Sequence, residues 1–418
     1  MKSTPPPIKL AHRAVGVMFC ANGILYASWV SRIPAARDAL AIGEKKLGLV
    51  LLGAAIGALL AFRVAGRLIA RFSSRTVTWV AASALCFALP LLGFMTSVVT
   101  LTMTLVLVGA ASGLMDVGMN AHGVEVEKRL GRPIFSSLHG IFSLGGLVGA
   151  ALGALVAGHG ISMRTHLVAV SAALLAVVLH GGRRLLREDM PVRVEVSAEE
   201  AEEHARTARL SGRTLEPSPS ARSEATTALL GLGAIAFCSS LGEGAMADWT
   251  GIYLQDVLHS TAGIAALGYA AYSLAMLTGR FAGDRITARL GEQRVVRTAG
   301  LFVTIGLSCA LAIPVRLFFF AGVIATGLGL SVLVPVVFRA AGRLPGLAPG
   351  AALARIATLS YGGFLIGPPA IGFLAEHFSL RIGLASIVVL ASGIVIFSRA
   401  AAPRELPAPT ATPLPQRQ

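Results

Sequence analysis

The sequence predicts an all-α membrane protein whose twelve spans form two bundles of six helices, and three observations support this prediction. Of its 418 residues, 55% are hydrophobic and only 14% are charged, with a mean hydropathy of +0.73. Soluble domains are about a quarter charged, so the composition excludes an ordinary soluble domain. Apolar runs of about 20 residues, the length that crosses a bilayer core, recur along the chain. A charged segment divides these runs into two sets of six.

The first set lies in residues 1–183 and the second in residues 226–400, and each set is predicted to form one bundle. The first run contains Asn22 and lacks a small-residue cleavage site, so we expect a retained helix rather than a signal peptide. Residues 184–225 form the predicted cytoplasmic linker, and residues 401–418 a predicted disordered cytoplasmic tail. The expected spans are 12–34, 46–69, 76–97, 99–124, 134–158 and 164–183, then 226–254, 262–283, 295–314, 316–340, 352–375 and 380–399.

The distribution of basic residues predicts how the chain is oriented in the membrane. With a cytoplasmic amino terminus, most of the 36 Lys and Arg residues lie on the cytoplasmic side. The exceptions are Arg32, Arg37, Lys45, Lys46, Arg164, Arg316 and Arg381. This bias follows the positive-inside rule, so we predict a multi-pass protein of the bacterial inner membrane with both termini cytoplasmic. The net charge of +15 then reflects membrane topology and requires no nucleic-acid partner.

The two halves resemble each other at an offset of about 218 residues, which predicts a parallel internal repeat. The stretch 66–75 after the second span matches 284–294 after the eighth, with one gap. In transporters built from such repeats, the binding site lies between the two bundles near the membrane midplane. Further matches, in the same order, join Ala27–Val30 to Ala247–Thr250, and Gly145 and Gly149 to Gly363 and Gly367. Close helix packing is the favoured explanation for the glycines of the fifth span, whereas Gly367, which precedes two prolines, marks either a hinge or a tolerated kink.

A carboxylate and an amide lie four residues apart on one face of the apolar fourth span, at Asp116 and Asn120. An acidic residue at the centre of a membrane helix costs roughly 2.5–3.5 kcal/mol on insertion scales, and it is tolerated mainly where it faces a protein interior or a water-filled path. A carboxyl group in a low-dielectric cavity can load and release a proton between conformations. We therefore predict that Asp116 couples transport to protons. The structural alternative is a neutral carboxyl group that is hydrogen-bonded between helices.

Twelve helices in two repeats, a long central linker and basic loops after the second and eighth spans resemble the major facilitator superfamily. Its loop signature has the form Gly-x-x-x-Asp-Arg/Lys-x-Gly-Arg/Lys-Arg/Lys. The clearer copy is Gly279–Arg285, followed by Leu290 and Gly291, whereas the copy after the second span has Ala70 at the aspartate position. The resemblance implies the major facilitator fold. We expect Asp284 and Arg285, in the clearer copy, to help gate the cytoplasmic side, with Asp284 approaching a helix amino terminus of the opposite half.

Within the superfamily, Asp116 and Asn120, followed by Ser137-Leu-His-Gly-Ile-Phe142, are similar to the branch that includes fucose–proton symporters. In that branch a carboxylate of the fourth helix is implicated in binding or coupling. The first span departs from the branch because it lacks an acidic residue and offers only Asn22, Tyr26 and Trp29. Glu243–Trp249 resembles an uncharacterised bacterial subgroup. Drug–proton antiporters usually carry an arginine in the fourth helix and a Gly-Pro element in the fifth. This sequence has neither of them.

The remaining candidate residues have competing interpretations. Glu243 is expected to line the central cavity from the half opposite Asp116 and to recognise a hydroxyl-rich or cationic solute. The two carboxylates are expected to differ in height by about 10 Å. Asp248 is either a gating residue or a solvated charge near a helix end. His139 pairs with Asp116 or satisfies a backbone carbonyl. Trp29 and Trp249 are predicted mainly as interfacial anchors, with a gating role for Trp249 as the alternative, whereas Tyr361 is the better cavity candidate.

We therefore predict a secondary active transporter that moves a small polar solute, such as a sugar, by alternating access, with proton symport. The alternatives are a proton-coupled exporter of metabolites or drugs and, from another class, a membrane sensor that does not transport. The sequence has no nucleotide-binding loop and no His-Glu-x-x-His zinc motif, so we expect no enzymatic activity, cofactor or metal. We expect the small-molecule substrate, protons and the lipid bilayer as partners, and a monomeric carrier.

Overall fold

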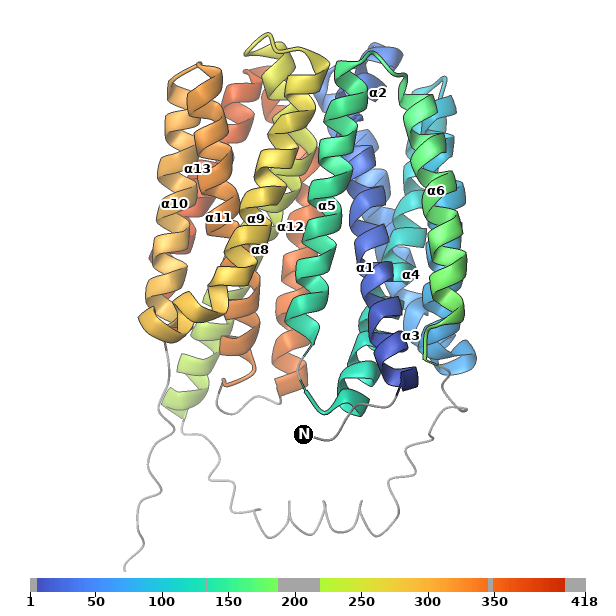
Figure 1. The fold of residues 1–418 in the computed structure, drawn as a ribbon. Helices are drawn as coiled ribbons and strands as arrows, with labels where there is room; N and C mark the ends of the chain where they lie inside the picture. Colours follow the sequence, from blue (N-terminus) through green and yellow to red (C-terminus); the bar gives the residue numbers. More distant parts are fainter. Residues whose placement is uncertain (1–5, 133, 187–218, 345–348, 403–418) are drawn as a thin grey trace, which may run out of the picture.

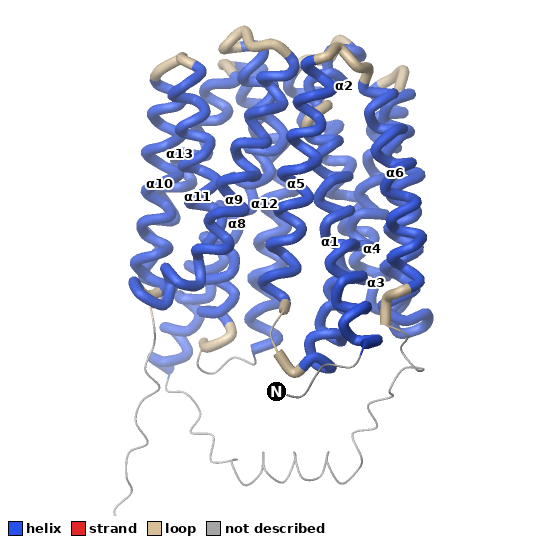
Figure 2. Tube along the Cα trace, viewed as in Figure 1, coloured by secondary structure: helices blue, strands red, loops and turns tan. Residues whose placement is uncertain are grey.

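The computed structural model describes residues 6–132, 134–186, 219–344 and 349–402. Within these ranges the chain forms helices and short connections and no strand (Figure 2). The first half contains α1 (Pro6–Val30), α2 (Ile33–Leu40), α3 (Glu44–Ala88), η1 (Leu89–Phe94), α4 (Val98–Leu130), α5 (Phe135–Gly158) and α6 (Met163–Arg183). The second half contains α8 (Pro219–Asp256), α9 (Ala262–Leu290), α10 (Glu292–Ala312), α11 (Arg316–Ala341), α12 (Pro349–His377), α13 (Leu380–Phe397) and η2 (Ser398–Ala401).

The described chain contains 11 helical segments that are long and apolar enough to cross a membrane, and one of them contains two crossings. The segment Glu44–Phe94 has 51 residues, and a straight helix of that length would extend about 77 Å, more than twice a bilayer core. At Ser73 the backbone leaves the helical conformation, with φ 76° and ψ 154°. Ala54 and Thr78, on either side of this break, both lie against α4. The segment is therefore a helical hairpin, and the predicted twelve-helix fold is confirmed.

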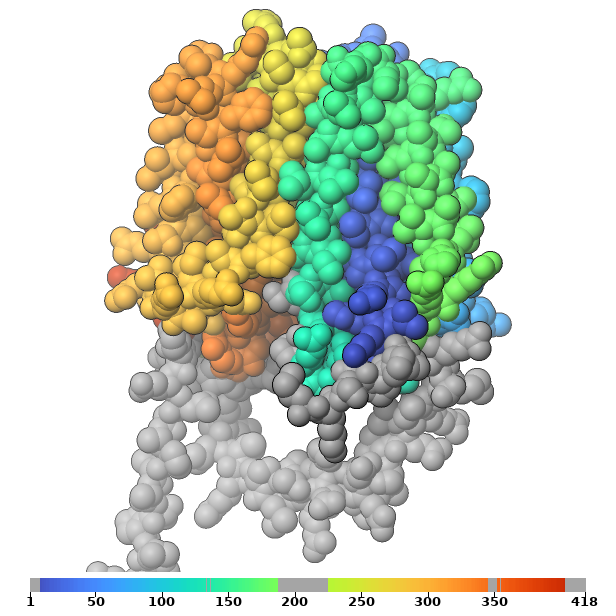
Figure 3. Space-filling model, in the orientation of Figure 1, coloured from blue at the N-terminus to red at the C-terminus, as the bar shows by residue number. Residues whose placement is uncertain are grey.

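The two halves stand side by side as separate bundles (Figure 1). Helices α1–α6 form one bundle and α8–α13 form the other, with α5 of the first packed along α9 of the second (Figure 3). We call the end where α1 begins and η2 ends the terminal end, and the end that carries α2 the distal end. Most of the predicted linker, 184–225, and nearly all of the predicted tail, 401–418, lie outside the described residues.

The glycines that repeat between the halves mark equivalent helix contacts. A Cβ atom at Gly145 of α5 would lie 2.2 Å from the carbonyl oxygen of Cys20 on α1. A Cβ atom at Gly363 of α12 would lie 2.4 Å from the carbonyl oxygen of Phe237 on α8. Only glycine allows backbones to approach so closely in membrane bundles. The equivalent helix pairs, α1 with α5 and α8 with α12, are therefore packed in the same way.

The short helix α2 lies at the distal end and contacts the other half. It follows α1 after a two-residue turn, and Pro34 at its start packs against α8 of the other half. A Cβ atom at Gly251 of α8 would lie 3.1 Å from the Pro34 ring. Residues near the distal ends of α1 and α8 are consequently shielded from lipid.

The turn at Ser73 provides a test of backbone strain. A non-glycine residue held at positive φ costs of the order of 1–3 kcal/mol. Ser73→Gly is therefore expected to raise the unfolding midpoint of the purified protein, by an amount equivalent to about 1 kcal/mol. Ser73→Ala is the matched control, because it removes the hydroxyl group that accepts from Thr76 N but keeps the Cβ atom. If glycine and alanine have the same effect, backbone strain at this position is refuted.

Candidate functional site

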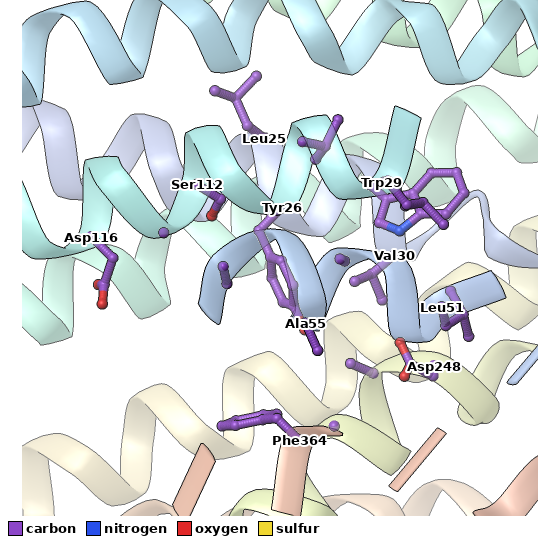
Figure 4. A pocket seen from close by; sticks show the side chains of 18 of the residues that line it. Leu25, Tyr26, Trp29, Val30, Leu51, Ala55, Ser112, Asp116, Asp248 and Phe364 are labelled. Atoms are coloured by element: carbon purple, nitrogen blue, oxygen red, sulfur yellow. The ribbon is translucent and has the colours of Figure 1, made fainter. Parts of the chain in front are cut away.

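A cavity of about 340 Å³ lies between the two bundles (Figure 4). The first half lines it from α1, α3, α4 and α5, and the second half from α8, α9 and α12. Most of the candidates predicted from the sequence meet here. They are Asn22, Tyr26, Trp29 and Asp116 from the first half, and Glu243, Asp248 and Tyr361 from the second.

Asp116 lies on the wall formed by α4 and is joined to Asn120, one turn further along the same helix. Asn120 Nδ2 donates to the Asp116 carboxylate at 3.0 Å and also to the Asp116 carbonyl oxygen at 2.8 Å. No basic side chain pairs with Asp116 among the described contacts. Asn120 does not line the cavity, and it therefore orients the carboxylate from behind. The carboxylate can consequently change its protonation state without breaking an ion pair.

Glu243, by contrast, is paired with a residue that sequence reasoning missed. Arg280 of α9 lies 3.5 Å from the Glu243 carboxylate, and both side chains are about a quarter exposed. Arg280 Nη1 also donates to the hydroxyl group of Ser143 on α5 at 2.6 Å. One guanidinium group therefore links α8, α9 and α5, and through α5 it links the two halves. The available signal was a lone arginine inside an apolar span, which is costly unless it is paired.

Asp248 also faces the cavity, although it lies toward the end opposite Asp116 (Figure 4). On α8 it is eight residues from the distal helix end, and it is partly buried. Tyr26 and Tyr269, which come from different halves, line the same cavity. The two tyrosine rings meet edge to face, with their centroids 6.4 Å apart. The structure therefore places Asp248 at the cavity wall rather than at a solvated helix end.

Tyr361 contributes the aromatic wall on the Asp116 side of the cavity. Its ring packs against Phe62 of α3 with the centroids 4.7 Å apart, and this contact crosses from one half to the other. Phe62, Tyr361 and Asp116 all line the cavity. An aromatic contact between the halves thus forms part of the same cavity wall as the acidic residue on α4.

His139 does not lie beside Asp116, and the described contacts give no carboxylate–imidazole pair. Its ring packs edge to face on Phe19 at 5.4 Å and lies 5.1 Å from Phe135. It does not line the cavity. The close packing of α1 on α5 accounts for this position, because it brings the first turns of α5 against α1 rather than α4.

The favoured interpretation of Trp29 and Trp249 as interfacial anchors is wrong. Trp29 is 6% exposed and lines the cavity, and Trp249 is fully buried. Both lie near the distal helix ends, where a tryptophan belt would normally face lipid headgroups. Here the short helix α2 and its contact at Gly251 enclose this region.

Asp284 has a partner in its own half rather than in the opposite one. Its carboxylate accepts from Arg339 of α11 at 2.8 Å, and both side chains are exposed. Arg339 and Arg343 also pair with Glu292, at the start of α10. Arg285 is exposed. The expected approach of Asp284 to a helix amino terminus of the other half is therefore not observed.

Charged contacts between the halves occur instead at the distal end. Arg37 of α2 pairs through both terminal nitrogens with Asp256 at the end of α8, with Nη2 2.8 Å from the carboxylate, and it also binds Asp38. Glu376 of α12 accepts from the backbone N–H of Lys45 in the first turn of α3, at 3.1 Å. A carboxylate at a helix amino terminus is electrostatically favourable. These two links join the bundles on the side away from Asp116.

Comparison with known proteins agrees with this architecture. The family model described as Major Facilitator Superfamily matches residues 232–417. An uncharacterized MFS-type transporter of Yersinia pestis is 32% identical over 382 residues, which cover 91% of this chain and 93% of that protein. Membrane protein MosC of Rhizobium meliloti is 32% identical over 396 residues, which cover 94% of this chain and 90% of that protein. The crystal structure of a D-xylose-proton symporter shares the fold, with a TM-score of 0.73 and 15% identity over 95% of this chain and 98% of that chain. The chain is therefore a multi-pass membrane transporter that belongs to the major facilitator superfamily.

Proposed function

We propose that this chain is a secondary active transporter that moves a small polar solute by alternating access, in symport with a proton carried by Asp116. The observation that carries the proposal is the cavity between the bundles, whose walls place carboxylates from both halves around one space. Central sites between repeats are typical of this transporter type. Rocking of one bundle against the other would expose such a cavity to each side of the membrane in turn.

The different partners of the acidic residues support Asp116 as the proton carrier. Glu243 is held by Arg280, so protonating it would break an ion pair. Asp116 accepts only from the amide of Asn120 among the described contacts, and a protonated carboxyl keeps acceptor capacity for that bond. Tyr361 and Phe62, which line the same cavity as Asp116, form a ring contact between the halves. Protonation of Asp116 would thus change charge at a contact between the halves. The resemblance of α4 to the fucose–proton symporter branch favours the same assignment.

We assign the terminal end to the cytoplasm on the basis of charge. The lysines and arginines that depart from the positive-inside pattern lie on α2, directly before it, or near the starts of α3, α6, α11 and α13, all at the distal end. A distal end that faces the periplasm of a bacterial inner membrane leaves the more basic face in the cytoplasm.

The test uses purified protein in liposomes and a solute that raises its thermal stability in a screen of metabolites. Addition of this solute to wild-type proteoliposomes should change the external pH, and an imposed pH gradient should drive uphill accumulation. Asp116→Asn should abolish both effects yet retain downhill counterflow, because only the coupling proton is lost. Glu125→Gln is the matched control, since Glu125 lies on the same helix in an exposed ion pair with Arg129. Undiminished proton movement in Asp116→Asn would refute the assignment.

A further inference from the structure

The cavity has an unbalanced charge. Its lining contains three carboxylates, Asp116, Glu243 and Asp248, and no lysine or arginine among the described residues. Arg280 lies outside the lining and neutralises Glu243. If Asp116 carries the coupled proton, Asp248 is the one carboxylate without a counter-ion. A charge in a cavity inside the membrane requires a partner, and here the described part of the protein does not supply it.

Asp248 has aromatic neighbours that suit a cation. Tyr26 of α1 and Tyr269 of α9 line the same cavity as Asp248, and Tyr26 extends into the space between Asp248 and Asp116 (Figure 4). The faces of aromatic rings attract ammonium groups, and the attraction grows when the site is desolvated. A cavity lined by this carboxylate and by two tyrosines therefore offers both a counter-charge and ring surfaces.

A buried amide gives an independent indication of what the ligand donates. Asn22 is 4% exposed and lines the cavity, and its Nδ2 is directed at the sulfur of Met119 at 3.9 Å. Its Oδ1 has no hydrogen-bond partner among the described residues. An unsatisfied buried acceptor is costly, so a ligand that donates a hydrogen bond there would stabilise the complex. The Asn22 amide oxygen and the Asp248 carboxylate are both acceptors, so each would bind a hydrogen-bond donor of the ligand.

We propose that the transported solute is a small organic cation, a primary amine that also bears hydroxyl groups, with its ammonium group bound by Asp248 beside Tyr26 and Tyr269. This inference rests on the proposed transport function and specifies its substrate class. Counted along their helices, Asp248 and Asp116 differ in height by about 15 Å, so a small solute bound at Asp248 leaves Asp116 free for the proton. A hydroxyl group of the solute would satisfy Asn22.

The test measures binding in detergent, where no gradient is needed. Probes of one scaffold that differ in charge are compared by the rise in unfolding midpoint: glucosamine, glucose and glucuronate, with ethanolamine, ethylene glycol and glycolate as a second, smaller series. In at least one series, the amine should raise the unfolding midpoint of the wild-type protein more than its neutral and acidic counterparts do. Asp248→Asn should weaken amine binding roughly tenfold or more, whereas Asp248→Glu should retain the preference for the amine. Glu125→Gln is again the control carboxylate.

A second pair of variants tests the aromatic contribution without removing charge. Tyr26→Phe keeps the ring and should retain the preference for the amine, whereas Tyr26→Leu should reduce it. The inference is overturned if a neutral or acidic probe stabilises the protein more than its amine, if no amine stabilises it, or if Asp248→Asn retains full amine binding. Amine binding without substrate-driven proton movement would instead overturn the proposed symport. A preference for glucose accompanied by proton movement would overturn only the cationic substrate.

Discussion

Replacing Arg280 by alanine is expected to abolish transport and to lower the free energy of unfolding by about 1–3 kcal/mol, because the Glu243 carboxylate is left without a partner inside the bundle. The loss of transport has a second cause, since the variant also removes the hydrogen bond to Ser143 that joins the halves. Thermal unfolding in detergent measures the loss of stability, and counterflow in liposomes measures the loss of transport.

The double variant Arg280→Gln with Glu243→Gln separates the two causes. It removes both charges together, so stability should recover toward the wild-type value while transport stays impaired. Arg129→Ala is the control, because its pair with Glu125 is exposed and worth about 0.3–0.5 kcal/mol. A wild-type unfolding midpoint in Arg280→Ala would show that Glu243 does not depend on this guanidinium group.

Reversing the charge of Arg37 is expected to open the distal end of the cavity. Arg37→Glu places a carboxylate against Asp256, so an ion pair between the halves becomes a repulsion. Coupling free energies of about 1–3 kcal/mol would shift the ratio of distal-open to distal-closed molecules about 5- to 150-fold. A cysteine introduced at Ser112, on the cavity wall, should then react faster with a membrane-impermeant maleimide applied at the distal side.

Two further variants complete this experiment in a background without the native cysteines. Arg37→Glu combined with Asp256→Arg restores opposite charges and should return the labelling rate toward wild type. Arg164→Glu changes a charge on the same face, but Arg164 stacks on Phe94 of its own half, so the rate should not change. An unaltered rate in Arg37→Glu would refute the role of this pair in closing the distal end.

The fold was predictable because membrane spans are the longest and most regular signal in the sequence. The predicted spans 46–69 and 76–97 correspond to the two arms of α3, although only Ser73 separates them in the structure. Hydropathy detects apolar length, but it does not show that a turn can be made by one residue at positive φ. Most candidate site residues were found for a related reason, since a polar group such as Asn22 or Asp116 stands out in an apolar helix.

The errors arose where a residue's position depended on the true end of a helix or on a neighbouring element. The eighth span was predicted to end at residue 283, which placed Arg280 near a loop, but α9 continues to Leu290. Arg280 is therefore about 15 Å inside the helix end, where it requires a partner. Trp249 was misjudged because α2 folds across the distal end, and no local pattern in α8 predicts that cover. Tertiary contacts, absent from the local sequence, determined both positions.

The corner that follows the first arm of α3 differs chemically from its counterpart in the second half. Ser74 and His122 share a hydrogen bond of 2.9 Å, whereas Glu292, the counterpart of Ser74 at the 218-residue offset, forms ion pairs with Arg339 and Arg343. Arg339 lies one residue before the duplicate of His122. The two corners of the repeat are therefore held by different pairs of side chains, and the position that faces the turn shifts by one residue between the halves. A chimera that moves one corner into the other half must therefore exchange the turn and the facing helix position together. If only one of them is exchanged, a carboxylate faces an imidazole in one half, or a guanidinium group faces a hydroxyl group in the other.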